Sequence, residues 1–133
     1  EEFELYYQPR LDLRSGAVLG MEARLRWNHP QLGRVSPMQF IPIAEETGSI
    51  LAIGDWVLRT ACAEGARWQR ALKLSVNIAG AQLAQHELPR LVHETLLETG
   101  LSPAKWMNRA TGTREAIFRP SRISLRTRAG SRW

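Results

Sequence analysis

The sequence predicts an α/β fold. This fold corresponds to the N-terminal portion of an α/β barrel, so the barrel is incomplete. Its segments follow the order strand, strand, helices, strand, helix, which is how such a barrel begins. A barrel of eight strands needs roughly 250 residues, whereas this chain has 133, of which 44% are hydrophobic. That apolar fraction is ordinary for a globular domain, so the composition permits a core but the length allows about half a barrel.

The first two strands are predicted near the N-terminus. Residues 3–8 are aromatic and β-prone, and Pro9 is expected to end this strand because proline lacks a backbone N–H. After a turn at 14–16, apolar residues alternate with others through 17–26. Alternation of this kind places every second side chain on one face of a strand. The face opposite the apolar one is expected to carry Glu22, Arg24 and Arg26.

A capping signal follows a loop that contains Asn28, Pro30 and Gly33. Ser36 precedes a proline, and Gln39 stands three residues after Ser36, which is the pattern of a capping box with proline at the first helical position. Pro42 is expected to interrupt this helical turn. Residues 43–47 are therefore predicted to form a separate short helix that ends at Gly48.

The next segments predict one long helix, one strand and a second helix. Apolar or small residues recur at helical spacing through 51–70. Residues 72–77 alternate between apolar and polar side chains, as a short strand does. A further helix is expected from about Leu88 to Glu98, ending at Gly100.

The net charge of +5 comes from the C-terminal part of the chain. Residues 106–133 hold seven arginines and one acid, so 1–105 sum to −1. We therefore expect two parts, an ordered domain over 1–105 and a divergent basic tail over 106–133 that is disordered or irregular. Cys62 is the one cysteine, which fits a core position and the reducing cytoplasm. No apolar run reaches the 18 residues of a membrane span.

Glu22 and Asn77 are the two positions where the residue type points to chemistry. Glu22 is a carboxylate within an otherwise apolar strand, and its burial is costly unless it binds or pairs with a cation. That cation is either a metal ion or a neighbouring arginine, Arg24 or Arg26. Asn77 ends a predicted strand, where barrel enzymes place functional groups. A helix cap or a turn is the other interpretation of an asparagine there.

Several separated motifs, in order, resemble one protein family. These are the stretches 5–9 (Leu-Tyr-Tyr-Gln-Pro), 22–27 (Glu-Ala-Arg-Leu-Arg-Trp), 36–48 and 75–78. The chain resembles the EAL domain family, bacterial signal transduction hydrolases that cleave the messenger cyclic di-GMP on a TIM-type barrel. The resemblance covers residues 3–105 and implies an EAL-type TIM barrel that is truncated.

The resemblance also implies roles for four residues. At the matching positions, family members use Glu22 and Asn77 to bind Mg²⁺ or Mn²⁺, Arg26 to contact a substrate phosphate, and Gln8 to contact the guanine or form the site wall. Oxygen ligands suit these hard cations, and a guanidinium fork suits a phosphate.

Two departures from the family pattern predict that the chain is a catalytically inactive phosphodiesterase fragment. Arg24 stands where the signature has leucine, so its guanidinium can reach Glu22 or stand beside the metal. The remaining metal-binding residues belong to later strands, and the run after Lys105 lacks the acidic residues of the next one. We therefore expect metal binding to be weak or absent.

Alternative functions remain open from the sequence. The chain could be a non-catalytic cyclic di-GMP-binding or regulatory protein-interaction module. It could also bind nucleic acid through its basic tail, although nucleic acid is the less favoured partner. An open half-barrel predicts a homo-oligomer or a partner domain that covers it, with residues 72–77 as the exposed edge strand.

Overall fold

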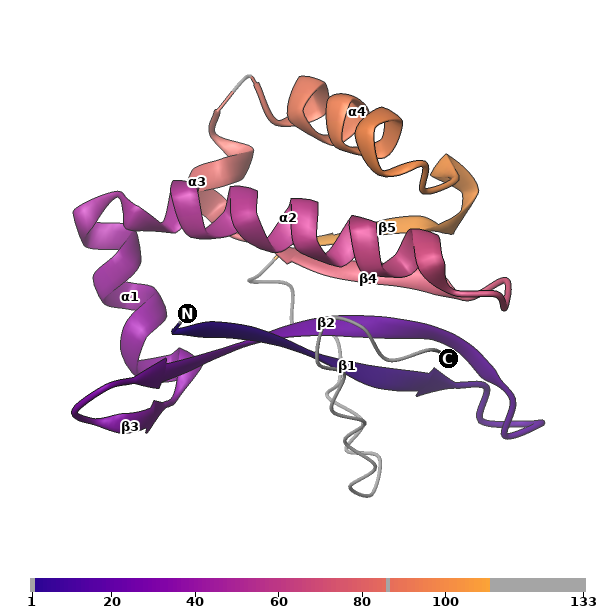
Figure 1. The fold of residues 1–133 in the computed structure, drawn as a ribbon, viewed down its shortest axis with the longest axis horizontal. Helices are drawn as coiled ribbons and strands as arrows, with labels where there is room; N and C mark the ends of the chain where they lie inside the picture. Colours follow the sequence, from indigo (N-terminus) through magenta and orange to yellow (C-terminus); the bar gives the residue numbers. More distant parts are fainter. Residues whose placement is uncertain (1, 86, 111–133) are drawn as a thin grey trace.

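The structure is a computed structural model that describes residues 2–85 and 87–110. A sheet is flanked on one side by helices (Figure 1). The strands are β1 (Phe3–Leu11), β2 (Val18–His29), β3 (Gly33–Val35), β4 (Lys73–Ile78) and β5 (Trp106–Ala110). The helices are α1 (Pro37–Thr47), α2 (Ser49–Arg67), α3 (Gly80–Leu83), α4 (Leu88–Thr99) and the short 3₁₀ helix η1 (Pro103–Lys105).

The sheet has the strand order β1-β2-β4-β5, with β3 paired to β2 outside this path. β1 runs antiparallel to β2, whereas β2, β4 and β5 are parallel to one another. Parallel neighbours joined through helices are the unit from which α/β barrels are built. The predicted α/β class and its element order are confirmed.

The apolar sides of the strands face α2 and form the core. The predicted alternation in β2 is confirmed from Met21 onwards, because Met21, Ala23 and Leu25 pack in this core. It is wrong at the start of the strand, where the register with β1 shifts, Val18 packs against the core and Leu19 is 54% exposed. The most enclosed apolar side chains come from α2 and β4: Leu58, Ala61, Cys62, Leu74, Val76 and Ile78. Cys62 is therefore a core residue, as predicted, and burial raises its thiol pKa to about 11.

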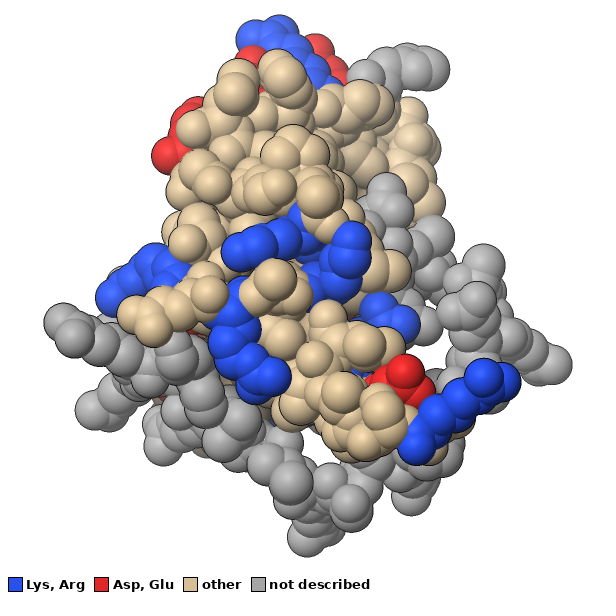
Figure 2. Space-filling view, turned by 90° about the vertical axis from the view of Figure 1, so that its right-hand side faces the viewer, with Lys and Arg blue, Asp and Glu red and all other residues tan. Residues whose placement is uncertain are grey.

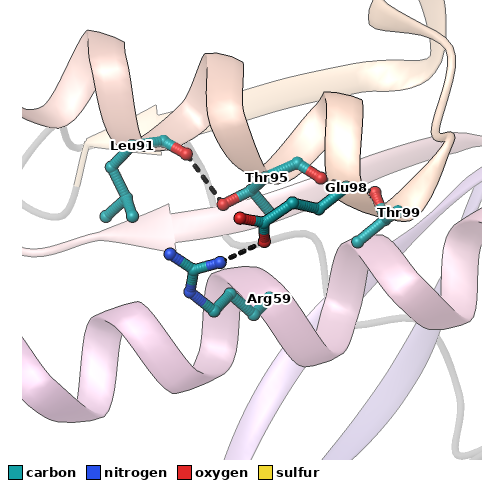
Figure 3. A network of polar contacts seen from close by, with 5 residues as sticks. All are labelled: Arg59, Leu91, Thr95, Glu98 and Thr99. Atoms are coloured by element: carbon teal, nitrogen blue, oxygen red, sulfur yellow. Dashed lines mark hydrogen bonds and ion pairs between the residues drawn. The ribbon is translucent and has the colours of Figure 1, made fainter.

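Helix α4 packs beside α2 through a polar as well as an apolar contact. Arg59 of α2 reaches across to Glu98 of α4, while Thr95 and Thr99 donate hydrogen bonds of 2.7 Å to carbonyl oxygens one turn earlier in α4 (Figure 3). Because both charged side chains of the ion pair are substantially exposed, we expect it to contribute little stability. The fully buried Thr95 satisfies its hydroxyl within its own helix.

Both prolines that were expected to end elements lie inside them. β1 continues through Pro9 to Leu11, because an edge strand has no second neighbour that needs the missing N–H. Helix α1 continues through Pro42. The helical hydrogen bond that Pro42 cannot make would have used the carbonyl of Met38, a residue that is 88% exposed and open to water. The capping box of Ser36 and Gln39 is confirmed.

The prediction that 72–77 is the exposed edge strand is wrong. Trp106–Ala110, which the sequence analysis assigned to the basic tail, forms strand β5 and pairs with β4 from Leu74↔Trp106 to Ile78↔Ala110. Within the described part of the sheet, the edges are therefore β1 and β5, together with the short β3, which pairs only with β2. The rest of the predicted tail, 111–133, lies outside the described residues.

Basic side chains gather at the end of the sheet where β4 begins (Figure 2). This end carries the β1–β2 turn and the connection from α2 to β4. Exposed basic residues stand at the end of α2 (Arg67), within the connection (Arg70) and at the start of β4 (Lys73). Lys73 donates a hydrogen bond to the carbonyl of Ala104. The amino ends of parallel strands in a barrel serve stability rather than chemistry, so this basic surface is separate from the site described next.

Candidate functional site

The candidate site lies on the polar face of the sheet, towards the carboxyl ends of β2 and β4. The strand register places Gln8 opposite Glu22, and Glu22 opposite Ser75. Since side chains in register share a face of the sheet, β1, β2 and β4 each contribute to one polar surface. The four residues predicted from the sequence, Gln8, Glu22, Arg26 and Asn77, come from these three strands.

Glu22 is the centre of the site, with only 9% of its surface exposed. Its Oε1 atom accepts a hydrogen bond of 3.2 Å from Nδ2 of Asn77. Its Oε2 atom lies 3.5 Å from Nη2 of Arg24. Thus the structure brings Glu22 and Asn77 together, as a shared function requires, and it forms the Glu22–Arg24 ion pair that was the alternative explanation of the buried carboxylate.

Arg26 lies within a group of basic and aromatic side chains. Its guanidinium carbon is 5.6 Å from the centre of the Tyr6 ring, as is that of Arg34, and cation–π attraction stabilises such contacts. Nη1 of Arg26 donates to the carbonyl of Leu25 at 3.1 Å. Burial, followed by the charges of Arg24 and Arg34, lowers the pKa of Arg26.

Three further residues belong to this surface and were not predicted. Tyr6 shares the face of Gln8 because it precedes it by two residues, so strand alternation could have identified it. Arg10 donates a hydrogen bond of 2.9 Å to the hydroxyl of Ser75, and the same alternation includes it. Arg34 bonds the Tyr6 hydroxyl at 3.1 Å, but it lies on β3, which the sequence analysis treated as a loop.

A cavity of about 160 Å³ opens beside these residues at the carboxyl ends of β2 and β4. Its polar lining comes from Arg24, Arg26, Asn77 and Gln82, and α1 and α2 contribute apolar residues such as Ile41 and Ile53. The carboxyl ends of barrel strands are where TIM-type enzymes bind their ligands. The cavity is therefore in the position expected of a ligand site.

The residues present do not fit a divalent metal centre. Both carboxylate oxygens of Glu22 already have a partner, one of them a cation. Among the described residues, no three His, Cys, Asp or Glu side chains cluster closely enough to hold a metal ion. The residue of β5 in register with Asn77 is Arg109. Arginine is positively charged, so this residue type does not bind metal cations.

Comparison with known proteins identifies the family. The sequence model of the EAL domain matches residues 1–108, so the chain belongs to the EAL domain family. It is similar to an uncharacterized signaling protein of Caulobacter vibrioides, with 50% identity over 78% of this chain and 13% of that protein. It is also similar to MucR of Pseudomonas aeruginosa, a bifunctional diguanylate cyclase and cyclic di-GMP phosphodiesterase, with 40% identity over 75% of this chain and 15% of MucR.

A solved structure gives the same result for the fold. The MucR phosphodiesterase in complex with cyclic di-GMP superposes with a TM-score of 0.77 and 39% identity, over 80% of this chain and 45% of that one. The chain therefore spans less than half of that structure and 13–17% of the length of the curated relatives it matches. The prediction of an incomplete EAL-type TIM barrel is confirmed. Within residues 2–85 and 87–110, no helix combines the length and hydrophobicity that crossing a membrane requires.

Proposed function

We propose that this chain is a part of an EAL-family cyclic di-GMP phosphodiesterase that does not itself hydrolyse the dinucleotide. The observation that carries the proposal is the state of Glu22, whose two carboxylate oxygens pair with Asn77 at 3.2 Å and with Arg24 at 3.5 Å. A carboxylate that is neutralised by an arginine is a poor ligand for Mg²⁺ or Mn²⁺. Hydrolysis by a metal-activated water would need that ligand free.

The residues of β5 support the same proposal. Parallel strands bring their carboxyl ends to one edge, so the strand after β4 is positioned to supply a further metal ligand. In this chain β5 reads Trp-Met-Asn-Arg-Ala and contains no acidic residue. Glu22 and Asn77 would then be two of the metal ligands, and members of the family supply the others from later strands.

A second candidate function is non-catalytic recognition of cyclic di-GMP. Gln8 and Arg26 are the proposed contacts to the ligand, and Arg26 lines the cavity at the carboxyl ends of the strands. The MucR phosphodiesterase, to which the chain is similar, forms a complex with cyclic di-GMP. We further propose a cytoplasmic location, with which the free, buried thiol of Cys62 is compatible.

A turnover assay tests the proposed inactivity. Purified chain is incubated with cyclic di-GMP and Mn²⁺ or Mg²⁺, and the linear product is separated by chromatography, with an intact EAL phosphodiesterase as the positive control. We expect no product from the wild-type chain. Arg24→Leu, which restores the signature residue, is expected to remain inactive because the later ligands are still missing. Metal-dependent turnover that Glu22→Ala abolishes would overturn the proposal.

A further inference from the structure

The turn between β1 and β2 exposes apolar side chains at the end of the sheet that carries the basic surface (Figure 1). Leu13 is 76% exposed, and Leu11 and Leu19 are also exposed. At the register shift between β1 and β2, Val18 packs against the core and leaves Leu19 outside. Single exposed leucines are common on proteins, whereas a group of them on one turn marks a contact surface.

The same turn satisfies backbone N–H groups internally. The N–H of Asp12 donates to the carbonyl of Ala17, and that of Gly16 to the carbonyl of Asp12, both at 2.8 Å. The N–H of Arg14 donates to the Asp12 carboxylate, also at 2.8 Å. Polar backbone groups that already have partners lose little when water is removed around them. The tip of the turn is therefore suited to an apolar environment.

Unpaired positive charge accompanies this turn. Arg14 lies in the turn, Arg67 and Arg70 belong to the basic surface, and all three are exposed. Within the described part of the chain, none of them forms an ion pair, whereas arginines elsewhere do. Residues 1–105 sum to −1, so the positive charge at this end results from segregation of charges and not from an excess of basic residues. Figure 2 shows basic side chains across the middle of this end and acidic ones towards its margin.

Together these features match the surface of an anionic lipid bilayer. Leucine side chains enter the boundary between headgroups and acyl chains, and each lysine or arginine near an anionic leaflet adds electrostatic attraction. Nucleic acids and acidic peptides are poorer matches, because their charged surfaces offer the leucines no apolar environment.

We propose that the β1–β2 turn and the basic surface bind the protein peripherally to a membrane that contains anionic phospholipids, with the leucines inserted and the arginines at the headgroups. This surface lies at the amino ends of the parallel strands, whereas the candidate site lies towards their carboxyl ends. A membrane-bound chain therefore keeps the candidate site turned away from the lipid. The inference goes beyond the proposed function and does not depend on it.

Co-sedimentation of the full chain with lipid vesicles tests the proposal. One set of vesicles is phosphatidylcholine alone, and the other is an equimolar mixture of phosphatidylcholine and phosphatidylglycerol. We expect binding to the mixture, little binding to phosphatidylcholine alone, and weaker binding in high salt, which screens the arginines. Because the basic segment 106–133 is present in every protein compared, differences between variants report on the proposed surface.

Two matched pairs of variants separate the leucines from the charges. Leu13→Ser is compared with Leu32→Ser, because Leu32 is 73% exposed in the turn at the other end of β2. Arg70→Gln is compared with Arg90→Gln, which removes the same charge from the start of α4, after the carboxyl end of β4. We expect binding to weaken about tenfold for Leu13→Ser and about fivefold for Arg70→Gln. Each control should stay within about twofold of the wild type, because its side chain is far from the bilayer.

A dye gives a second measurement that does not require Leu13→Ser to fold. A polarity-sensitive fluorophore is attached to Leu13→Cys and, as the control, to Leu32→Cys. Cys62 stays unlabelled because it is completely buried. On anionic vesicles the emission should shift to shorter wavelength at position 13 and stay unchanged at position 32.

The inference is wrong if the anionic vesicles do not bind the chain, if Leu13→Ser folds and binds them like the wild type, or if the dye at position 13 stays in water. It is also wrong if the chain binds duplex DNA or polyglutamate through the same surface, with a loss for Arg70→Gln and none for Leu13→Ser. That result would assign the surface to an acidic macromolecule instead of lipid. The turnover assay with cyclic di-GMP is unaffected by any of these outcomes, so the two proposals fail separately.

Discussion

At the scale of single residues, the site depends on side chains two positions apart along one strand. Glu22, Arg24 and Arg26 were predicted to share a face, and the register and contacts of β2 agree with this. Alternation was sufficient for that prediction because it is a property of the backbone. It did not decide whether Arg24 or Arg26 pairs with Glu22, since that choice depends on side-chain rotamers and on Tyr6 and Arg34 from other strands.

Gly20 lies at a position where β2 and β4 approach closely. A Cβ atom on Gly20 would stand 2.4 Å from the backbone oxygen of Lys73, so Gly20→Ala forces the two strands apart. We expect a loss of about 1–3 kcal/mol in the free energy of unfolding, typical of overpacking. Gly80→Ala is the control, because its Cβ meets nothing within 4 Å. Urea denaturation of both variants measures the difference, and equal stability would contradict the close contact.

Cys62 gives the protein a defined dependence on alkaline pH. Burial raises the thiol pKa from 9.0 to about 11, so the folded state favours the protonated thiol. This contribution is fully present below the unfolded pKa near 9 and is lost as the pH rises towards 11. At pH 10 the loss should be about 1 kcal/mol.

Chemical denaturation at pH 7 and pH 10 tests this loss, with Cys62→Ala to isolate it from other groups. Tyr7 also has a raised pKa through burial, with the charges of Glu64 and then Cys62 as smaller causes. Because the folded Tyr7 hydroxyl stays protonated at pH 10, its contribution differs little between the two proteins. The wild type should lose more stability than the variant between the two pH values. An equal loss would show that the thiol is accessible to water.

At the scale of elements, the sequence indicated the strands and helices better than their ends. Helical spacing predicted α2 and α4 because both have one apolar face against the core. β5 was missed because Trp106–Ala110 has no alternation of apolar and polar residues. Its strand structure comes from pairing with β4, which is a tertiary contact that no local pattern contains.

Truncation at two neighbouring positions tests the role of β5. A chain that ends at Lys105 lacks β5, and it exposes the hydrogen-bonding edge of β4 and the apolar surface that Trp106 covers. A chain that ends at Ala110 keeps both. We expect the shorter chain to melt at a lower temperature and to aggregate, because a bare strand edge pairs with other chains.

Thermal melts followed by circular dichroism compare the two truncated chains with the full chain. The proposal that residues 111–133 have no core role requires the chain ending at Ala110 to melt like the full chain. Limited proteolysis should then cut first after the arginines of this segment. A much lower melting temperature after loss of 111–133 alone would show that the segment packs against the domain.

The capping box of α1 is the second feature that can be tested at this scale. The Ser36 hydroxyl accepts a hydrogen bond of 3.3 Å from the backbone nitrogen of Met38. Ser36→Ala removes this acceptor and should cost about 1 kcal/mol of stability, whereas Ser36→Asp should retain most of it. Denaturation curves of the two variants decide whether the cap contributes, and identical curves would show that it does not.

At the scale of the whole molecule, the fold class was predictable and the association state was not. The order of strands and helices can be inferred from the sequence, and this order predicted the incomplete barrel. Whether another chain covers the open sheet depends on its surface, and the structure shows that this surface is largely polar: Tyr6, Gln8, Arg10, Glu22, Arg24, Arg26 and Asn77 come from it. Hydrophobic burial therefore supplies less of the drive for association than an open barrel suggests.

We retain the proposal that the chain associates with itself or with a partner, through the edge strands β1 and β5 or through the polar face. Light scattering during size-exclusion chromatography at several protein concentrations measures the mass. In 1 M salt the Debye length is about 3 Å, so association through charged faces should weaken. Association through strand edges depends on backbone hydrogen bonds and should persist. A mass of 15.1 kDa at every concentration would exclude self-association of the chain.

The direction of β1 has a practical consequence for anyone who prepares this protein. Because β1 runs antiparallel to β2, Phe3 pairs with Trp27 and Glu2 accepts a hydrogen bond of 2.9 Å from the Trp27 indole. The start of the described chain therefore lies at the rim that holds the cavity, near α1 (Figure 1). An affinity tag fused at the N-terminus would stand beside the candidate site, and a fluorescent dye attached there would be well placed to report entry of the proposed ligand.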